Sequence, residues 1–130
     1  MTECYYKKID SQGNPGYKTV KFAKHYRKLD NYYFPTIRKR DNKLRTGNWY
    51  FIKSPSRVFK ALLMANYPSI LDNVPTSILT TDTDTTTREQ AIQDLRQYYP
   101  DLEEEDVVRV LWFLKSPRED NNAEKDLHGL

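Results

Sequence analysis

The first third of the chain has the composition of β-strands, although apolar and polar positions alternate only irregularly. Residues 3–9 and 17–22 are rich in Tyr, Val, Ile and Phe, and residues 11–16 between them include two Gly, one Asn and one Pro. Because Gly, Asn and Pro favour tight turns, the pattern predicts an antiparallel hairpin. The next segment, residues 23–29, fits either a helical turn or an extension of the second strand.

A second pair of strands is predicted over residues 32–37 and 48–53, where aromatic and β-branched residues return. Pro35 marks the first of these as an edge strand or the site of a bulge. Residues 38–47 connect the two strands and close on Thr46-Gly47, so we expect a second hairpin with a basic tip. The cations of this tip are Arg38, Lys39, Arg40, Lys43 and Arg45.

A helix is predicted to begin at Ser54-Pro55, because Ser is a favoured N-cap and Pro a favoured first helical residue. The apolar stripe that follows at helical spacing is Val58, Leu62 and Ala65. Pro68 ends this predicted helix. Residues 70–79 show no regular pattern, and residues 80–87 (TTDTDTTT) predict a polar linker.

Two further helices are predicted beyond the linker. Residues 86–89 fit a capping box, and apolar residues at helical spacing continue from Arg88 until Pro100 ends the helix. Residues 101–106 place carboxylates at the positive end of the next helix dipole, and this strongly apolar helix is expected to continue through Leu114. Residues 117–130 are polar and predict a disordered tail.

The stretch AIQDLRQYYPDLEEEDVVRVLWFL within residues 88–114 resembles the two-helix segment of the small DUF433-type antitoxin family. In that family a helix ends in Tyr-Pro, a short Asp-Leu link follows, and a second helix opens with acidic residues. The resemblance covers about 25 of the 130 residues. It implies a helix-turn-helix type module in a regulatory protein.

These elements predict an α+β fold: N-terminal antiparallel β-hairpins with a helix, followed by a C-terminal helical pair and a disordered tail. The predicted parts are a basic, aromatic-rich β/α domain at residues 1–79, a polar linker at 80–87, an acidic helical pair at 88–116 and the tail at 117–130. A length of 130 residues is typical of one domain with a small appendage.

Charge is distributed unevenly along the chain. Residues 1–60 carry 15 Lys and Arg against 4 Asp and Glu, a net charge of +11, whereas residues 61–130 carry 6 against 14, a net charge of −8. A strongly basic half points to contact with nucleic acid, DNA or RNA. The alternative is that the two halves neutralise each other within the fold.

The favoured function is therefore a small nucleic-acid-binding regulatory or accessory protein that binds through the basic hairpin tip. Aromatic rings offer faces on which bases stack, and basic side chains contact phosphates. The predicted contacts outside the tip are Lys24, Arg27, Lys28, Lys53, Tyr33 and Trp49, with Lys18 and Lys21 in support.

Two other functions remain open. A protein-binding inhibitor or adaptor, of the phage or mobile-element type, would use an acidic helical surface formed by Glu103, Glu104, Glu105 and Trp112. The third is a small nuclease, although the sequence shows no catalytic constellation: His25 and His128 are the only histidines, and neither has a metal-ligand partner at the required spacing.

Composition adds four expectations. The single cysteine, Cys4, cannot form an internal disulfide and suits a reducing compartment. The chain shows no signal peptide and no run of 18 apolar residues, so we expect no membrane partner and a cytoplasmic location, or a nuclear one in a eukaryote. We predict no metal and no cofactor. The pattern indicates no small-molecule substrate.

Overall fold

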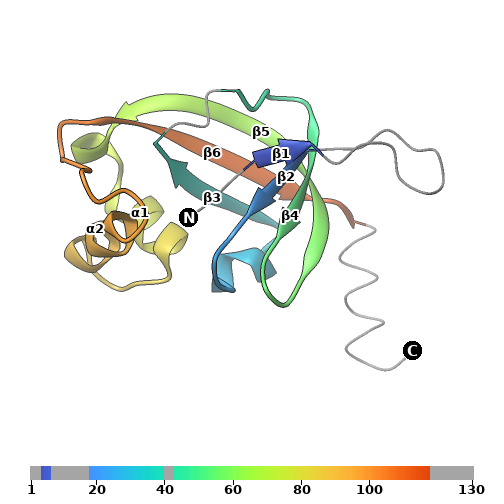
Figure 1. Ribbon diagram of the computed structural model, residues 1–130, viewed down its shortest axis with the longest axis horizontal. Coiled ribbons are helices and arrows are strands. Elements are labelled where there is room, and N and C mark those ends of the chain that lie inside the picture. The colour runs from blue at the N-terminus through green and yellow to red at the C-terminus, as the bar shows by residue number, and fades with distance from the viewer. Residues whose placement is uncertain (1–3, 7–17, 40–42, 118–130) are drawn as a thin grey trace.

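The computed structural model describes residues 4–6, 18–39 and 43–117, and its six strands form one mixed sheet in the order β1-β2-β4-β5-β6-β3 (Figure 1). The strands are β1 (Cys4–Tyr6), β2 (Lys18–Lys21), β3 (Tyr33–Arg38), β4 (Trp49–Lys53), β5 (Val58–Ile70) and β6 (Val107–Lys115). The helices are α1 (Thr76–Thr83) and α2 (Arg88–Arg96), with short 3-10 turns η1 (Arg27–Asp30) and η2 (Leu71–Asn73). The predicted α+β class is confirmed. No helix among the described residues is long and apolar enough to cross a membrane.

The first predicted hairpin is confirmed in its strand pairing. β1 and β2 are antiparallel, with Tyr5 opposite Thr19. The turn predicted at residues 11–16 lies outside the described residues.

The second predicted hairpin is wrong, although both of its strands exist. β3 lies at the sheet edge and pairs with β6, so that Tyr33 lies opposite Leu114. β4 pairs antiparallel with β5 and parallel with β2. Strands β5 and β6 lie between β4 and β3 in the sheet. The apolar faces that match best belong to strands that are distant in sequence.

The helix predicted from Ser54 to Pro68 is also wrong, since residues 58–70 form the longest strand, β5. Ser-Pro begins a β-turn as readily as a helix, because proline also suits the second position of a turn. Ser54 donates its backbone N–H to the Arg57 carbonyl (2.9 Å), and its Oγ accepts from the Arg57 N–H (3.2 Å). Phe59, Ala61 and Leu63 are buried with the two-residue period of a strand.

The helix predicted over residues 101–114 is a third correction. Asp106 forms a tight turn with Glu103, and residues 107–115 then form strand β6 between β5 and β3. β6 has buried side chains on both faces, and its nearly continuous apolar sequence therefore lacks the alternation that identifies a strand. Of the two helices that the antitoxin resemblance implies, only the first, α2, is present in this segment.

The polar linker predicted at residues 80–87 is partly helical. Residues 80–83 complete α1, in which Leu79, Asp82 and Thr83 are buried. Threonine has a low helix propensity, and tertiary contacts override it here. The predicted start of the next helix is confirmed: Thr87 is the N-cap of α2, and its Oγ1 accepts the Gln90 N–H (3.2 Å). Residues 118–130 of the predicted tail lie outside the described residues.

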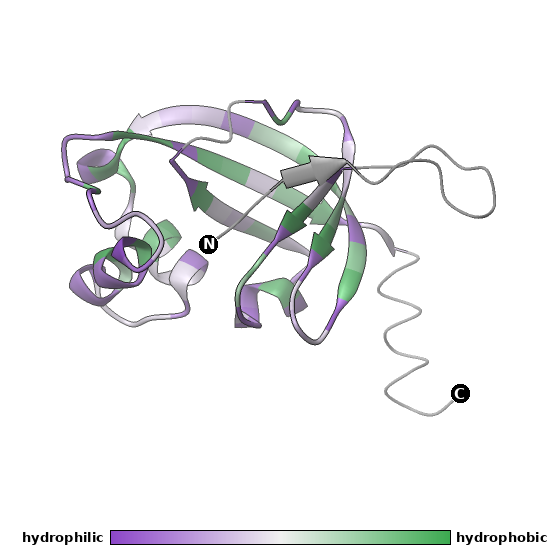
Figure 2. Cartoon of the chain, in the orientation of Figure 1, coloured by the Kyte–Doolittle hydropathy of each residue, from purple (hydrophilic) through white to green (hydrophobic). Residues whose placement is uncertain are grey.

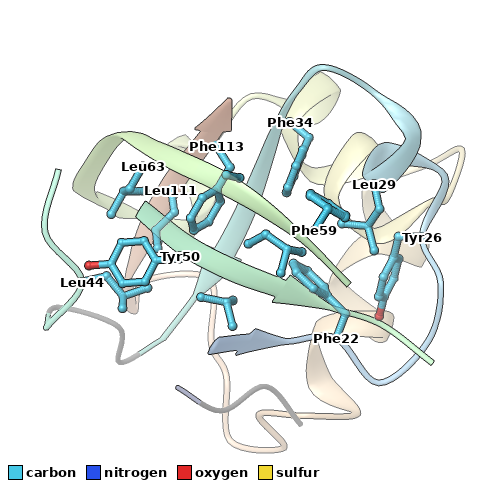
Figure 3. Packing of buried hydrophobic residues seen from close by; sticks show 13 residues of the cluster. Phe22, Tyr26, Leu29, Phe34, Leu44, Tyr50, Phe59, Leu63, Leu111 and Phe113 are labelled. Atoms are coloured by element: carbon cyan, nitrogen blue, oxygen red, sulfur yellow. The ribbon is translucent and has the colours of Figure 1, made fainter. Parts of the chain in front are cut away.

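Two hydrophobic clusters hold the fold together. The first packs aromatic and aliphatic side chains on the inner face of the curved sheet, where Phe22, Tyr26 and Leu29 close over Phe34, Phe59 and Phe113 (Figure 3). The second packs α1 and α2 against the opposite face at one end of the sheet, through Ile37, Val108 and Val110. Figure 1 shows both helices at that end, and Figure 2 shows hydrophobic residues along β3, β4 and β6.

Candidate functional site

The five cations predicted at a hairpin tip occupy different environments. Arg38 is buried at the end of β3, where its Nε donates to Thr36 Oγ1 (3.1 Å) and its guanidinium lies 4.7 Å from the ring centroid of Phe22. Lys39 forms an ion pair with Asp106 (3.6 Å). Lys43 and Arg45 are exposed, and Arg40 lies outside the described residues. The four described residues do not form a single basic tip.

Three more predicted contacts gather around η1, each beside a carboxylate. Lys24 Nζ lies 3.3 Å from Asp94, and Arg27 Nε lies 2.6 Å from Asp84. Lys28 pairs with Asp82, and neither side chain is more than 6% exposed. The positive charges of these three predicted contacts are therefore balanced by carboxylates in α1, in α2 and at the residue that follows α1.

The Lys28–Asp82 pair is buried and connects three elements. Asp82 also accepts the Ile37 backbone N–H (3.2 Å), so it joins η1, α1 and β3. Burial lowers the pKa of Lys28 to about 8, and the attraction of Asp82 offsets only part of that effect. Burial, followed by a hydrogen bond with Tyr98, raises the pKa of the adjacent Tyr26 hydroxyl.

Two hollows adjoin this pair. A cavity of about 20 Å³ lies between β3, α1 and α2, which is room for about one water molecule. An open groove of about 300 Å³ lies between η1 and the end of α1. All the residues that line the groove are polar: Arg27, Lys28, Asn31, Thr80, Thr81, Asp84 and Thr85.

Asp84 shapes this groove from the C-cap of α1. Its backbone has φ 58° and ψ 46°, the left-handed conformation that Asp tolerates better than most residues. Burial works against its ionised form, but the two hydrogen bonds from Arg27 outweigh burial and lower the pKa of Asp84. The carboxylate therefore stays charged and keeps Arg27 at the groove.

A network around His25 was not apparent from the sequence. His25 Nδ1 lies 3.2 Å from Ser56 Oγ, and Nε2 lies 3.2 Å from Asp30 Oδ1, to which Arg57 Nη1 also donates (2.9 Å). Ser56 follows His25 by 31 residues, and Arg57 follows Asp30 by 27 residues. The network fastens the β4–β5 turn to the segment before η1. No group of three or more potential metal ligands occurs within the ranges that the structure describes.

The face of the sheet opposite the first hydrophobic cluster gathers the remaining predicted residues. We call it the outer face. Tyr33, Lys53 and Tyr67 are exposed on it, and it comprises side chains of five neighbouring strands: Lys21, Tyr33, Trp49, Phe51, Lys53, Lys60, Leu62, Tyr67, Trp112 and Leu114. Strand register puts Trp49, Leu62, Leu114 and Tyr33 in one row across four strands. The helices cover this face only at the end that carries Ile37 and Val110.

Aromatic rings on the outer face are ordered by mutual contacts. Tyr33 stacks on Trp112, with ring centroids 4.9 Å apart and an interplanar angle of 20°. Trp112 Nε1 donates to the Tyr67 hydroxyl (3.3 Å), and Tyr33 and Tyr67 are 46% and 41% exposed. On the neighbouring strands, Lys60 Nζ lies 5.3 Å from the ring centroid of Trp49.

Charge is segregated by element as well as along the chain. The six described strands contain seven Lys and Arg but no Asp or Glu. Carboxylates occur in the helices, the 3-10 turns and the loops, and Glu103, Glu104 and Glu105 are all exposed before β6. The predicted acidic surface also included Trp112. This residue belongs instead to the outer face and lies roughly 20 Å beyond the glutamates along an extended chain.

Comparisons with protein-family models, with curated proteins and with solved structures found no match for this chain.

Proposed function

We propose that this protein binds nucleic acid through the outer face of its sheet. The observation that carries the proposal is the Tyr33–Trp112 stack, which lies on strands without carboxylates and on the same face of the sheet as Lys53 and Lys60. Aromatic faces for bases and cations for phosphates are the two components of nucleic-acid surfaces. The predicted contacts Tyr33, Trp49 and Lys53 keep their roles, and the proposed site moves from the hairpin tip to the outer face.

Fluorescence anisotropy with a labelled oligonucleotide tests this proposal. Binding should weaken steeply between about 50 and 200 mM salt, because phosphate contacts release counterions. The double variant Lys53→Glu/Lys60→Glu should lose binding. The matched control Lys43→Glu/Arg45→Glu, which reverses two exposed cations of the predicted tip, should retain it.

Three results would change this assignment. Equal loss in the two double variants would extend the contact to residues 43–45. Loss in the control alone would return the site to the predicted tip. An absence of binding at low salt with single-stranded DNA, duplex DNA and RNA would refute nucleic-acid binding altogether.

A second candidate function is the binding of a small polar ligand in the groove between η1 and α1. Its volume of about 300 Å³ matches the lower range of ligand sites, and Lys28 is among the residues that line it. A panel of nucleotides and sugar phosphates should include a compound that raises Tm. That rise should be lost in Asn31→Ala and Thr81→Ala, whose exposed side chains line the groove.

A further inference from the structure

The edge position of β3 determines which ring surface of Tyr33 is accessible. One face of the ring is covered by Trp112 on the neighbouring strand β6. Because β3 is the last strand of the sheet, no strand of the described structure lies beyond the other face of the ring. A planar group placed there would extend the existing stack. The stack is formed before a ligand arrives, so less side-chain entropy is lost on binding.

Cations lie at the opposite side of the same row. Trp49 is in register with Tyr33 across three strand spacings, which is about 14 Å. Lys60 lies over Trp49, and Lys53 is exposed four residues further along β4. The cations of the outer face therefore lie on β2, β4 and β5, whereas the Tyr33–Trp112 stack lies on β3 and β6.

This arrangement discriminates between forms of nucleic acid. In a duplex the base faces are occupied by neighbouring bases, and only base edges and phosphates are accessible. The row of four strands is also broader than the major groove, which is about 12 Å wide. A single strand offers both exposed base faces and a flexible backbone.

We infer that the outer face binds single-stranded nucleic acid, with bases stacked on the Tyr33–Trp112 side and phosphates directed toward Lys53 and Lys60. This inference rests on the proposed nucleic-acid-binding function and specifies its ligand. The stack contributes affinity that depends little on salt, whereas the lysines contribute the salt dependence. The two sides of the face thus make separable contributions.

Anisotropy titrations with one sequence, prepared as single-stranded DNA, as single-stranded RNA and as duplex DNA, test the ligand class. We expect at least tenfold tighter binding of one or both single strands than of the duplex. Equal or tighter duplex binding would overturn the inference and leave nucleic-acid binding intact. Binding of none of the three would refute both.

Single substitutions test the proposed orientation. Tyr33→Ala should weaken single-strand binding roughly 5- to 150-fold and leave the slope of log K against log salt unchanged. Tyr32→Ala is the matched control, because Tyr32 is adjacent and equally exposed at 46%. Lys53→Ala should instead make the slope shallower by about 0.7, the value for one phosphate contact on a single strand.

A changed salt slope in Tyr33→Ala, or an equal loss of affinity in Tyr32→Ala, would contradict this orientation. Thermal unfolding of each variant identifies any loss of affinity that follows from loss of structure. If Tyr33→Ala proves unstable, Tyr33→Leu keeps apolar bulk but removes the ring, and it should show the same loss of affinity.

Discussion

Lys28 and Asp82 show how a buried ion pair can fix the arrangement of distant segments. Lys28 belongs to η1 and Asp82 to α1, 54 residues later, and Asp82 also binds the backbone of β3. The lysine ammonium additionally lies 4.7 Å from the ring centroid of Phe22. Neither side chain can exchange its partner for water without opening the fold, because both are buried.

Replacing Lys28 alone should therefore be strongly destabilising. Lys28→Met leaves Asp82 buried without its cation, and we expect a loss of about 3–5 kcal/mol in the free energy of unfolding, measured by urea denaturation. The double variant Lys28→Met/Asp82→Leu removes both charges and should recover most of that loss. A double variant no more stable than the single one would contradict this account.

The lowered pKa of Lys28 also predicts a pH dependence. Between pH about 8 and 10 the unfolded lysine, whose ordinary pKa is 10.5, remains protonated while the folded one loses its proton. The unfolded state then binds more protons, so this group makes the free energy of unfolding rise with pH. Above pH 10, ionisation of Tyr26 in the unfolded state acts in the opposite direction.

Urea denaturation at several pH values in this range should show the wild-type protein gaining stability relative to Lys28→Met/Asp82→Leu. The comparison with the double variant cancels the titration of exposed lysines and tyrosines. A constant difference would indicate that Lys28 keeps its proton throughout the range.

The environment of Arg38 could not be predicted from its neighbours in sequence. It stands in a run of five cations that suggested an exposed tip, yet its side chain is 1% exposed. Its burial depends on Phe22 and on the pairing of β3 with β6, both of which involve residues distant in sequence. Charge reversal at Arg38 would therefore measure folding more than nucleic-acid binding.

At the scale of elements, α2 depends on its cap. Thr87 accepts the Gln90 N–H, and the Gln90 side chain accepts the Thr86 N–H (3.2 Å). Thr87→Ala should lower the free energy of unfolding by about 1 kcal/mol. Thr81→Ala, on the exposed side of α1, should change it by less than about 0.5 kcal/mol. Similar losses in the two variants would argue against the cap.

The strands β5 and β6 explain why two of the three predicted helices are wrong. A bulge at Met64 shifts the register of β5, so that Leu62 and Ala65 both belong to the outer side of the sheet. This shift gave the apolar residues of β5 a spacing that also fits a helix. β6 has buried side chains on both faces, Val108 and Val110 on one and Leu111 and Phe113 on the other, and its apolar run carries no period that distinguishes strand from helix.

At the scale of the whole molecule, the sheet depends on the last described strand. β6 lies between β5 and β3, and Lys115 also donates from Nζ to the Leu29 carbonyl (2.8 Å). Truncation before Thr80 removes β6 and α2 together. We expect the remaining chain to be unfolded by circular dichroism and by amide chemical-shift dispersion. A folded fragment would show that residues 1–79 form a unit without β6.

The outer face could be predicted only in part. The sequence identified Tyr33, Trp49 and Lys53 as candidate contacts by residue type, but it grouped Trp112 with the acidic residues before β6. Strand register brings Trp112 beside Tyr33 from a position 79 residues away. No local pattern contains that information.

The sequence by itself determined the α+β class, the pairing of the first two strands, the start of α2 and the separation of charge. These features depend on turn residues, capping residues and composition, which act over a few neighbouring residues. Only the tertiary structure decided which strands pair, which cations are buried and which aromatic rings share a face. Those outcomes depend on matching apolar surfaces between distant segments, where the burial of one face constrains all others.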